Sequence, residues 1–164
     1  MRFKDKLFRA LNPIYARDPL SGRGAELYGG RFSPKGMPAL YTSVSIMTAI
    51  REANQAGSLQ PTTLVAYDAI IENVFDARDS RALASYGMDA DALADPSWRE
   101  QMVKRGKSRT QEFAEQLVTE GFQGILVRSF APGATDDDLN LILWSWGTED
   151  AKLEVIDEEG RLAP

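Results

Sequence analysis

The sequence predicts a single α+β domain with a mixed or split β-sheet and flanking helices. The first observation is that the chain has 164 residues, 43% hydrophobic and 26% charged, which is typical of one globular domain with a sizeable core. The second is that short apolar runs typical of strands are spread along the whole chain. The third is that segments with helical periodicity gather in its middle. We therefore treat residues 1–164 as one domain.

The N-terminal third is predicted to hold strands around a long loop. About the first ten residues form a strand. Residues 18–38 are rich in Gly, Pro and Ser, but large apolar side chains interrupt them, which indicates an ordered loop and not a flexible linker. Residues 39–42 form a short strand. A helix then begins after a capping serine, Ser43 or Ser45, and ends near Gly57.

The rest of the chain is predicted to alternate strands and helices. A strand at 62–71 is expected to continue through 74–76. The polar stretch that follows contains short helices near 80–86 and 97–104. Residues 110–120 have apolar side chains four apart and form a better helix. The remaining strands are expected at residues 124–129, 139–146 and 153–156.

Composition excludes several classes of site. The chain contains no Cys and no His, so disulfides, thiolate catalysis, Ser-His-Asp triads and Cys- or His-ligated metals are ruled out. Its net charge is 19 − 24 = −5, the opposite of what binding to nucleic acid requires. We find no signal peptide and no apolar run long enough to cross a bilayer, so the expected location is the cytoplasm.

Residues 28–36, Tyr-Gly-Gly-Arg-Phe-Ser-Pro-Lys-Gly, form the most informative segment. Glycines let a backbone approach a ligand closely, and Arg31 offers a planar guanidinium suited to a pyrophosphate. The plainer interpretation is a glycine-rich turn with an exposed arginine, because such loops are common.

Other polar residues are also candidates. Tyr41 offers a flat face at a strand end, Glu52 could line the rim of a pocket beside that strand, and Ser129 could present a hydroxyl at a sheet edge. Taken singly, they are better explained as a half-buried strand aromatic, a solvated helix residue and a turn residue. Asn140 is an amide on an otherwise apolar strand and needs a partner if buried. The acidic run 136–138 lacks the spaced ligands of a calcium loop, so we expect a solvated loop and no metal.

Together these segments resemble the RES domain family, which is named for an arginine, a glutamate and a serine. The resemblance runs through nearly the whole chain. Its most specific part is the glycine–arginine motif, followed by Tyr-Thr-Ser at 41–43 and then by Glu52. The resemblance identifies the family's three residues as Arg31, Glu52 and Ser129. Ser33 departs from the pattern, since Asn is more usual at that position.

The resemblance implies an ADP-ribosyltransferase-like fold and an enzyme that cleaves NAD+ at its nicotinamide–ribose bond. Such an enzyme is the toxin of a bacterial type II toxin–antitoxin system, and it arrests growth. The implied partner is an antitoxin with an Xre-type DNA-binding region, which agrees with the acidic charge of this chain. The sequence looks closer to the branch that transfers ADP-ribose to a protein, with a nucleotide-precursor enzyme such as phosphoribosyl pyrophosphate synthetase as acceptor.

Two alternatives stay open at this point. One is an NAD+ hydrolase or phosphorylase without a protein acceptor, which shares the same cleavage step. The other, ranked well below, is a non-catalytic partner-binding module.

The resemblance also implies roles for individual residues. Glu52 would stabilise the positive charge that develops on the ribose, as in glycoside cleavage. The expected catalytic residues are Arg31, Tyr41, Glu52 and Ser129. The expected NAD+-binding residues are Arg9, Tyr28, Gly30, Arg31, Tyr41, Ser129 and Asn140, with the arginines on the pyrophosphate and Tyr41 stacked on nicotinamide.

Overall fold

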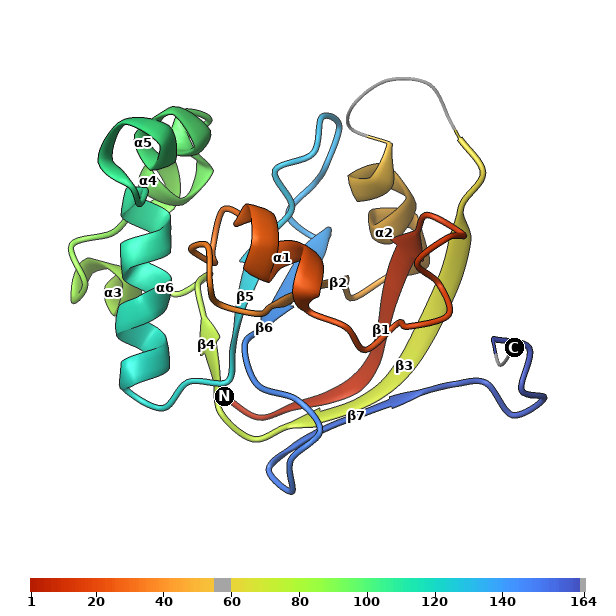
Figure 1. Cartoon of the computed structure of the whole chain (residues 1–164). Coiled ribbons are helices and arrows are strands. Elements are labelled where there is room, and N and C mark those ends of the chain that lie inside the picture. Colours follow the sequence, from red (N-terminus) through yellow and green to blue (C-terminus); the bar gives the residue numbers. More distant parts are fainter. Residues whose placement is uncertain (55–59, 163–164) are drawn as a thin grey trace.

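A seven-stranded β-sheet organises the chain, with the strand order β4-β5-β6-β2-β1-β3-β7 (Figure 1). The computed structural model describes residues 1–54 and 60–162. The neighbours β4 and β5 pair in parallel and the other neighbours pair antiparallel, so the sheet is mixed, as predicted. The strands are β1 (Phe3–Leu11), β2 (Leu40–Ser43), β3 (Thr63–Ile71), β4 (Val74–Asp76), β5 (Gly124–Arg128), β6 (Leu139–Leu143) and β7 (Ala151–Val155).

The sheet is nearly divided between β1 and β2. These two strands share one registered pair, Phe8 with Ser43, whereas β1 pairs with β3 along its whole length. One half of the sheet therefore contains β4, β5, β6 and β2, and the other contains β1, β3 and β7. Figure 1 shows the strands of the second half curving below those of the first; the sheet is continuous, so of the two predicted forms it is the mixed one.

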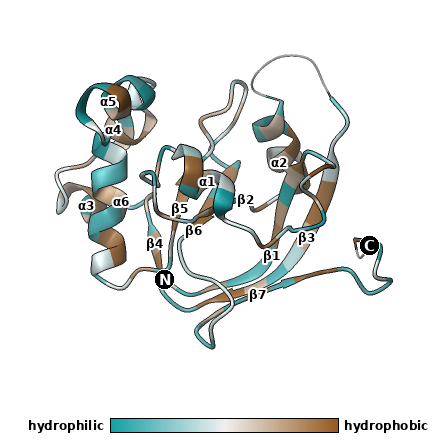
Figure 2. Cartoon of the chain, in the orientation of Figure 1, coloured by the Kyte–Doolittle hydropathy of each residue, from teal (hydrophilic) through white to brown (hydrophobic). Residues whose placement is uncertain are grey.

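Two apolar clusters lie on opposite faces of β5 and β6, because successive side chains of a strand point to opposite faces. Leu126 and Leu141 belong to the first cluster, where they meet side chains of β1, β3 and β7 such as Tyr67. Ile125 and Ile142 belong to the second, which packs against the helices. Figure 2 shows hydrophobic residues along the strands and on parts of the helices that flank them. Tyr41 packs against the second cluster, so its side chain lies on that face.

The helices flank the sheet, and most begin at a side-chain cap. Ser45 accepts a hydrogen bond from the Thr48 amide, as predicted, and Ser108 and Gln111 form a capping box at the start of the longest helix. Within the described residues, no helix has the length and apolar character needed to cross a membrane. The helices are α1 (Arg23–Tyr28), α2 (Ile46–Ala53), α3 (Ser80–Ala84), α4 (Ala90–Ala94), α5 (Trp98–Arg105) and α6 (Arg109–Thr119).

The structure corrects two predictions about helices. Residues 23–28 form α1 inside the predicted loop, although this helix has no side-chain cap and buries no residue. A helix of only six residues is not stable by itself, so contacts outside it stabilise it, including a hydrogen bond from the Gly36 amide to the Glu26 carbonyl. Residues 90–94 form α4, which begins at a cap by Asp89 that the prediction missed. The predicted helix end at Gly57 lies outside the described residues.

The structure also corrects three predictions about strands. Residues 74–76 do not continue β3 but pair with β5 at the opposite edge of the sheet, where the Asn73 amide also donates to the Gln123 side-chain oxygen. The strand at 139–146 ends at Leu143, opposite the first residue of β5, so the ladder stops there. The last strand is β7, and it begins at Ala151 and not at residue 153.

Candidate functional site

A cavity of about 380 Å³ lies on the face of the sheet that the helices flank. Its walls come from α1 and the loop after it, from β2 and α2, from α5, and from the ends of β5 and β6. Arg31, Tyr41, Glu52 and Gly30 all line it, although they are far apart in the sequence. The lining residues are Gly24, Ala25, Gly29, Gly30, Arg31, Phe32, Tyr41, Glu52, Trp98, Arg99, Val127, Phe130 and Ile142.

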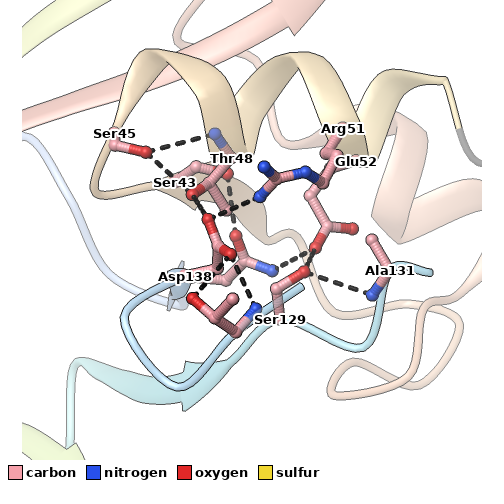
Figure 3. Close-up of polar contacts among 10 residues, drawn as sticks. Ser43, Ser45, Thr48, Arg51, Glu52, Ser129, Ala131 and Asp138 are labelled. Carbon is pink, nitrogen blue, oxygen red and sulfur yellow. Dashed lines mark hydrogen bonds and ion pairs between the residues drawn. The ribbon is translucent and has the colours of Figure 1, made fainter. Parts of the chain in front are cut away.

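The Glu52 carboxylate is held by side chains from β6 and from the end of β5 (Figure 3). Its Oε1 accepts a hydrogen bond from the Ser129 hydroxyl and a second, of 2.6 Å, from the Asn140 amide. The Asn140 carbonyl oxygen accepts a 2.7 Å bond from the Ser43 hydroxyl, which answers the question of its partner. The Ser129 hydroxyl oxygen also accepts from the Ala131 amide at 3.2 Å. The carboxylate therefore has a fixed position in the cavity wall.

Asp138 clamps the loop that carries Ser129 onto α2. Its carboxylate forms an ion pair of 2.7 Å with Arg51 and accepts a 2.8 Å hydrogen bond from the Thr48 hydroxyl. The Thr135 amide donates to the same carboxylate at 2.8 Å, and the Ser129 amide donates to the Asp138 carbonyl at 2.8 Å. The prediction of a solvated loop at 136–138 is therefore wrong for Asp138, whose side chain is 14% exposed.

These hydrogen bonds also set the charge state of the clamp. The bonds from the Thr135 amide and the Thr48 hydroxyl lower the pKa of Asp138 to about 2. The carboxylate is therefore ionised at neutral pH, as its ion pair with Arg51 requires.

The Tyr41 phenol ties β2 to the glycine-rich loop. Its oxygen accepts from the Phe32 amide at 3.1 Å and lies 2.7 Å from the hydroxyl of Ser33. Burial raises the pKa of Tyr41 to about 12, so the phenol is neutral at physiological pH. A Cβ on Gly30 would lie 2.3 Å from the Tyr41 oxygen, so the missing side chain of Gly30 makes room for this phenol.

The Arg31 guanidinium lies between the backbone at the end of α4 and an aromatic ring. Its Nη1 donates to the carbonyls of Leu93 at 3.0 Å and Asp95 at 2.8 Å. Its central carbon lies 4.5 Å from the centre of the Phe130 ring, within cation–π distance. Burial lowers the pKa of Arg31, and the charge of Arg99 lowers it further.

Two predicted site residues lie elsewhere. Arg9 and Tyr28 line a neighbouring hollow of about 560 Å³, which shares Gly24 of α1 with the first cavity. Arg9 donates to the Pro19 carbonyl at 3.1 Å, and the Tyr28 residue is 73% exposed. The structure thus separates these two from the cavity that holds Arg31, Tyr41 and Glu52.

Three residues of the cavity had no signal in the sequence. Trp98, Arg99 and Phe130 line it, and the Arg99 guanidinium lies 4.5 Å from the centre of the Trp98 ring. A Trp-Arg pair at the start of a short polar helix is common on surfaces, so only the fold brings these residues to the cavity. In the described part of the chain, no three acidic side chains are grouped so that they could hold a metal ion.

Comparison with known proteins places the chain in a family. No curated protein matches it. The model of the RES domain matches residues 6–163, which is nearly the whole chain. RES domains are associated with NAD-utilising toxin–antitoxin systems. On the strength of this match, the chain belongs to the RES domain family.

Proposed function

We propose that this chain is a toxin that cleaves the nicotinamide–ribose bond of NAD+ and transfers the ADP-ribose to a cellular protein, which arrests growth. The observation that carries the proposal is the convergence of Arg31, Tyr41 and Glu52 on one cavity, with the Glu52 carboxylate held by Ser129 and Asn140. Membership of a family associated with NAD-utilising toxins supports the choice of substrate.

Glu52 carries the chemistry in this proposal. Positive charge builds on the ribose as its bond to nicotinamide breaks, and a nearby carboxylate stabilises that charge more in the transition state than in the ground state. The bonds from Ser129 and Asn140 fix the carboxylate in advance, so little reorganisation is needed at the moment of reaction. Nicotinamide leaves as a neutral ring, so the step needs no general acid, which suits a chain without histidine.

Arg31 and Tyr41 bind the substrate in this proposal. Arg31 would contact the pyrophosphate through the part of its guanidinium that is not bonded to the Leu93 and Asp95 carbonyls. The aromatic face of Tyr41 would stack on nicotinamide while its oxygen stays bonded in the loop. Because the phenol stays neutral, Tyr41 would not act as a base.

The proposed partners follow from the family. An antitoxin with an Xre-type DNA-binding region would bind this acidic chain and hold the operator itself. A nucleotide-precursor enzyme such as phosphoribosyl pyrophosphate synthetase would accept the ADP-ribose. If water or phosphate reached the ribose carbon instead, the same site would hydrolyse or phosphorolyse NAD+.

The test is an incubation of the purified chain with a cell lysate and NAD+ labelled in its adenylate half. Free nicotinamide and label on protein are both recorded, for the wild type, for Glu52→Gln and for Glu112→Gln on the exposed face of α6. Glu52→Gln should lower the rate of nicotinamide release by about 10²–10³. Glu112→Gln should leave the rate unchanged, since the Glu112 side chain is 54% exposed and pairs with exposed Arg105 at 3.4 Å.

The possible outcomes distinguish a transferase, an NAD+-depleting toxin and a partner-binding module. Nicotinamide release with label on a discrete protein supports the transferase and reveals its acceptor. Release with all label in small molecules makes the chain an NAD+-depleting toxin. No release from the wild type would reject the enzyme proposal and leave a partner-binding module.

A further inference from the structure

Two arginines line the cavity that holds Glu52. Arg31 reaches it from the glycine-rich loop and Arg99 from the first turn of α5. Like charges that share a small cavity repel each other, and the charge of Arg99 lowers the pKa of Arg31 accordingly. The repulsion between the two charges must therefore be offset by other contacts or by a bound anion.

The Trp98 ring supports both guanidiniums. The Trp98 residue is almost buried, at 8% exposure, and the centre of its ring lies 4.5 Å from the central carbon of Arg99 and 6.0 Å from that of Arg31. The Phe130 ring lies against Arg31 from another side. Aromatic faces attract cations without supplying a negative charge. Aromatic rings therefore lie against both guanidiniums, Arg31 is also held by the Leu93 and Asp95 carbonyls, and none of these contacts supplies a full negative charge.

The carboxylates that act on Arg31 are shared with other hydrogen-bond donors. Among the ion pairs of the described part of the chain, none that we identify joins either guanidinium to a carboxylate. The charges of Asp95 and Glu52 both favour protonated Arg31, but both carboxylates also accept other hydrogen bonds, that of Glu52 from Ser129 and Asn140. The Asp95 carboxylate accepts from the Ser97 amide at 2.9 Å, from the Ser97 hydroxyl at 2.7 Å and from Gln101 at 3.2 Å. The cavity therefore favours an anion between its two arginines.

We infer that Arg99, supported by Trp98, forms with Arg31 a two-armed site for a diphosphate, and that Arg99 sets the preference for diphosphate-bearing nucleotides. Forked guanidiniums suit phosphate oxygens, and two of them match a group that carries charge on both phosphates. The inference rests on the proposed function, because the diphosphate is taken to be that of NAD+. In this arrangement Arg31 is fixed to the backbone, whereas Arg99 is exposed and contacts the ligand from the rim.

The test measures binding of ADP-ribose and of inorganic pyrophosphate to the full chain by calorimetry. Four proteins are compared: wild type, Arg99→Gln, Arg99→Lys and Arg105→Gln, the last at the far end of α5. Arg99→Gln should weaken ADP-ribose binding by about tenfold or more, and Arg99→Lys by less, because lysine keeps the charge but loses the fork. Arg105→Gln should bind like wild type. Thermal unfolding of each free protein checks that the exposed substitutions leave the fold intact.

The outcomes for binding and for turnover are independent. Arg99→Gln should raise the KM for NAD+ and leave kcat nearly unchanged, because Arg99 contacts no reacting atom. Equal affinity of wild type and Arg99→Gln for ADP-ribose, or no binding of either anion by wild type, would overturn the inference even if nicotinamide is released. Arg99-dependent binding without nicotinamide release would uphold the anion site and reject the proposed activity.

Discussion

Tyr41 lies at the cavity and also holds the glycine-rich loop in place. Its hydroxyl bonds to the Phe32 amide and to the fully buried Ser33 hydroxyl. Tyr41→Phe should therefore lower the free energy of unfolding by about 1–3 kcal/mol, because two polar groups lose a partner. If Tyr41 acts by stacking, kcat should survive, since phenylalanine keeps the ring. Chemical denaturation and nicotinamide release measure the two effects separately, and a large loss of kcat in a stably folded variant would reject the stacking role.

The Tyr41 phenol also limits the space for a side chain at Gly30. A methyl group at Gly30 would meet the Tyr41 oxygen at 2.3 Å and the adjoining ring carbon at 2.7 Å, so something must shift. Gly30→Ala should destabilise the fold by about 1–3 kcal/mol, as overpacking does. Gly24→Ala is the matched control: its methyl group meets nothing within 4 Å, and an alanine in α1 should be neutral or stabilising by about 0.5–1 kcal/mol. Equal unfolding midpoints for the two variants would show that the clash does not matter.

Some residues of the site can be predicted from the sequence, and others cannot. Arg31, Tyr41 and Glu52 could be picked out only together, by the spacing they share with a family, because each has a plainer explanation alone. Arg99 could not be picked out, since its role depends on a rotation of α5 that no local pattern encodes. The reverse holds for Tyr28, whose motif placed it at the site while the fold places it at a neighbouring hollow.

At the scale of elements, the Asp138 clamp joins α2 to the segment between β5 and β6. The pKa of Asp138 is about 2 in the folded chain, below the ordinary value of about 3.9 for an unfolded aspartate. A depressed folded pKa means that the ionised group stabilises the fold. This contribution is complete above about pH 4 and is lost as pH falls from about 4 to 2.

Asp138→Asn should therefore be less stable than wild type at neutral pH, and the difference should shrink as pH falls through that window. Urea unfolding of both proteins between about pH 2 and 7 measures it. Asp136→Asn is the control, because the Asp136 side chain is 93% exposed and lies 3.5 Å from Arg128. A stability gap between wild type and Asp138→Asn that does not change with pH would contradict the ionised clamp.

Gln111 links α6 to the glycine-rich loop. Its amide nitrogen donates to the Gly30 carbonyl at 2.9 Å, and its amide oxygen accepts from the Ser108 amide at 2.9 Å. Gln111 itself is fully buried. Gln111→Leu should cost about 1–3 kcal/mol for each polar group it leaves without a partner. Gln116→Leu, on the same helix, is the comparison, because Gln116 lies outside the capping box. Denaturant unfolding that gives both variants equal stability would reject this link.

Local sequence patterns predict well the elements that have a side-chain cap or one apolar face of their own. Ser45 and the regular apolar spacing of residues 110–120 place α2 and α6 closely, because a cap and one apolar face are local features. Local patterns fail for α1, which buries no residue and whose neighbours hold it. They also fail for the clamp, since the acidic run at 136–138 looks solvated until α2 packs over it.

At the scale of the molecule, the order of the strands in the sheet could not be predicted from the sequence. Two strands that follow each other in the chain, β3 and β4, lie apart in the sheet, because β4 pairs in parallel with β5 about fifty residues later. The position of the candidate site depends on this strand order. Its cavity forms where α2, β5 and β6 meet, three elements whose mutual approach depends on long-range pairing.

Because the cavity is built from segments spread between residues 24 and 142, a ligand there should protect all of them at once. Glu52→Gln is the protein to use, since it should bind NAD+ without consuming it. Hydrogen exchange with saturating NAD+ should slow in the glycine-rich loop, at the start of α5 and in the segment after β5. It should stay unchanged in β7, whose residues do not line the cavity. Protection confined to the hollow beside Arg9 and Tyr28 would move the NAD+ site to that hollow, and with it every role assigned here to Arg31 and Glu52.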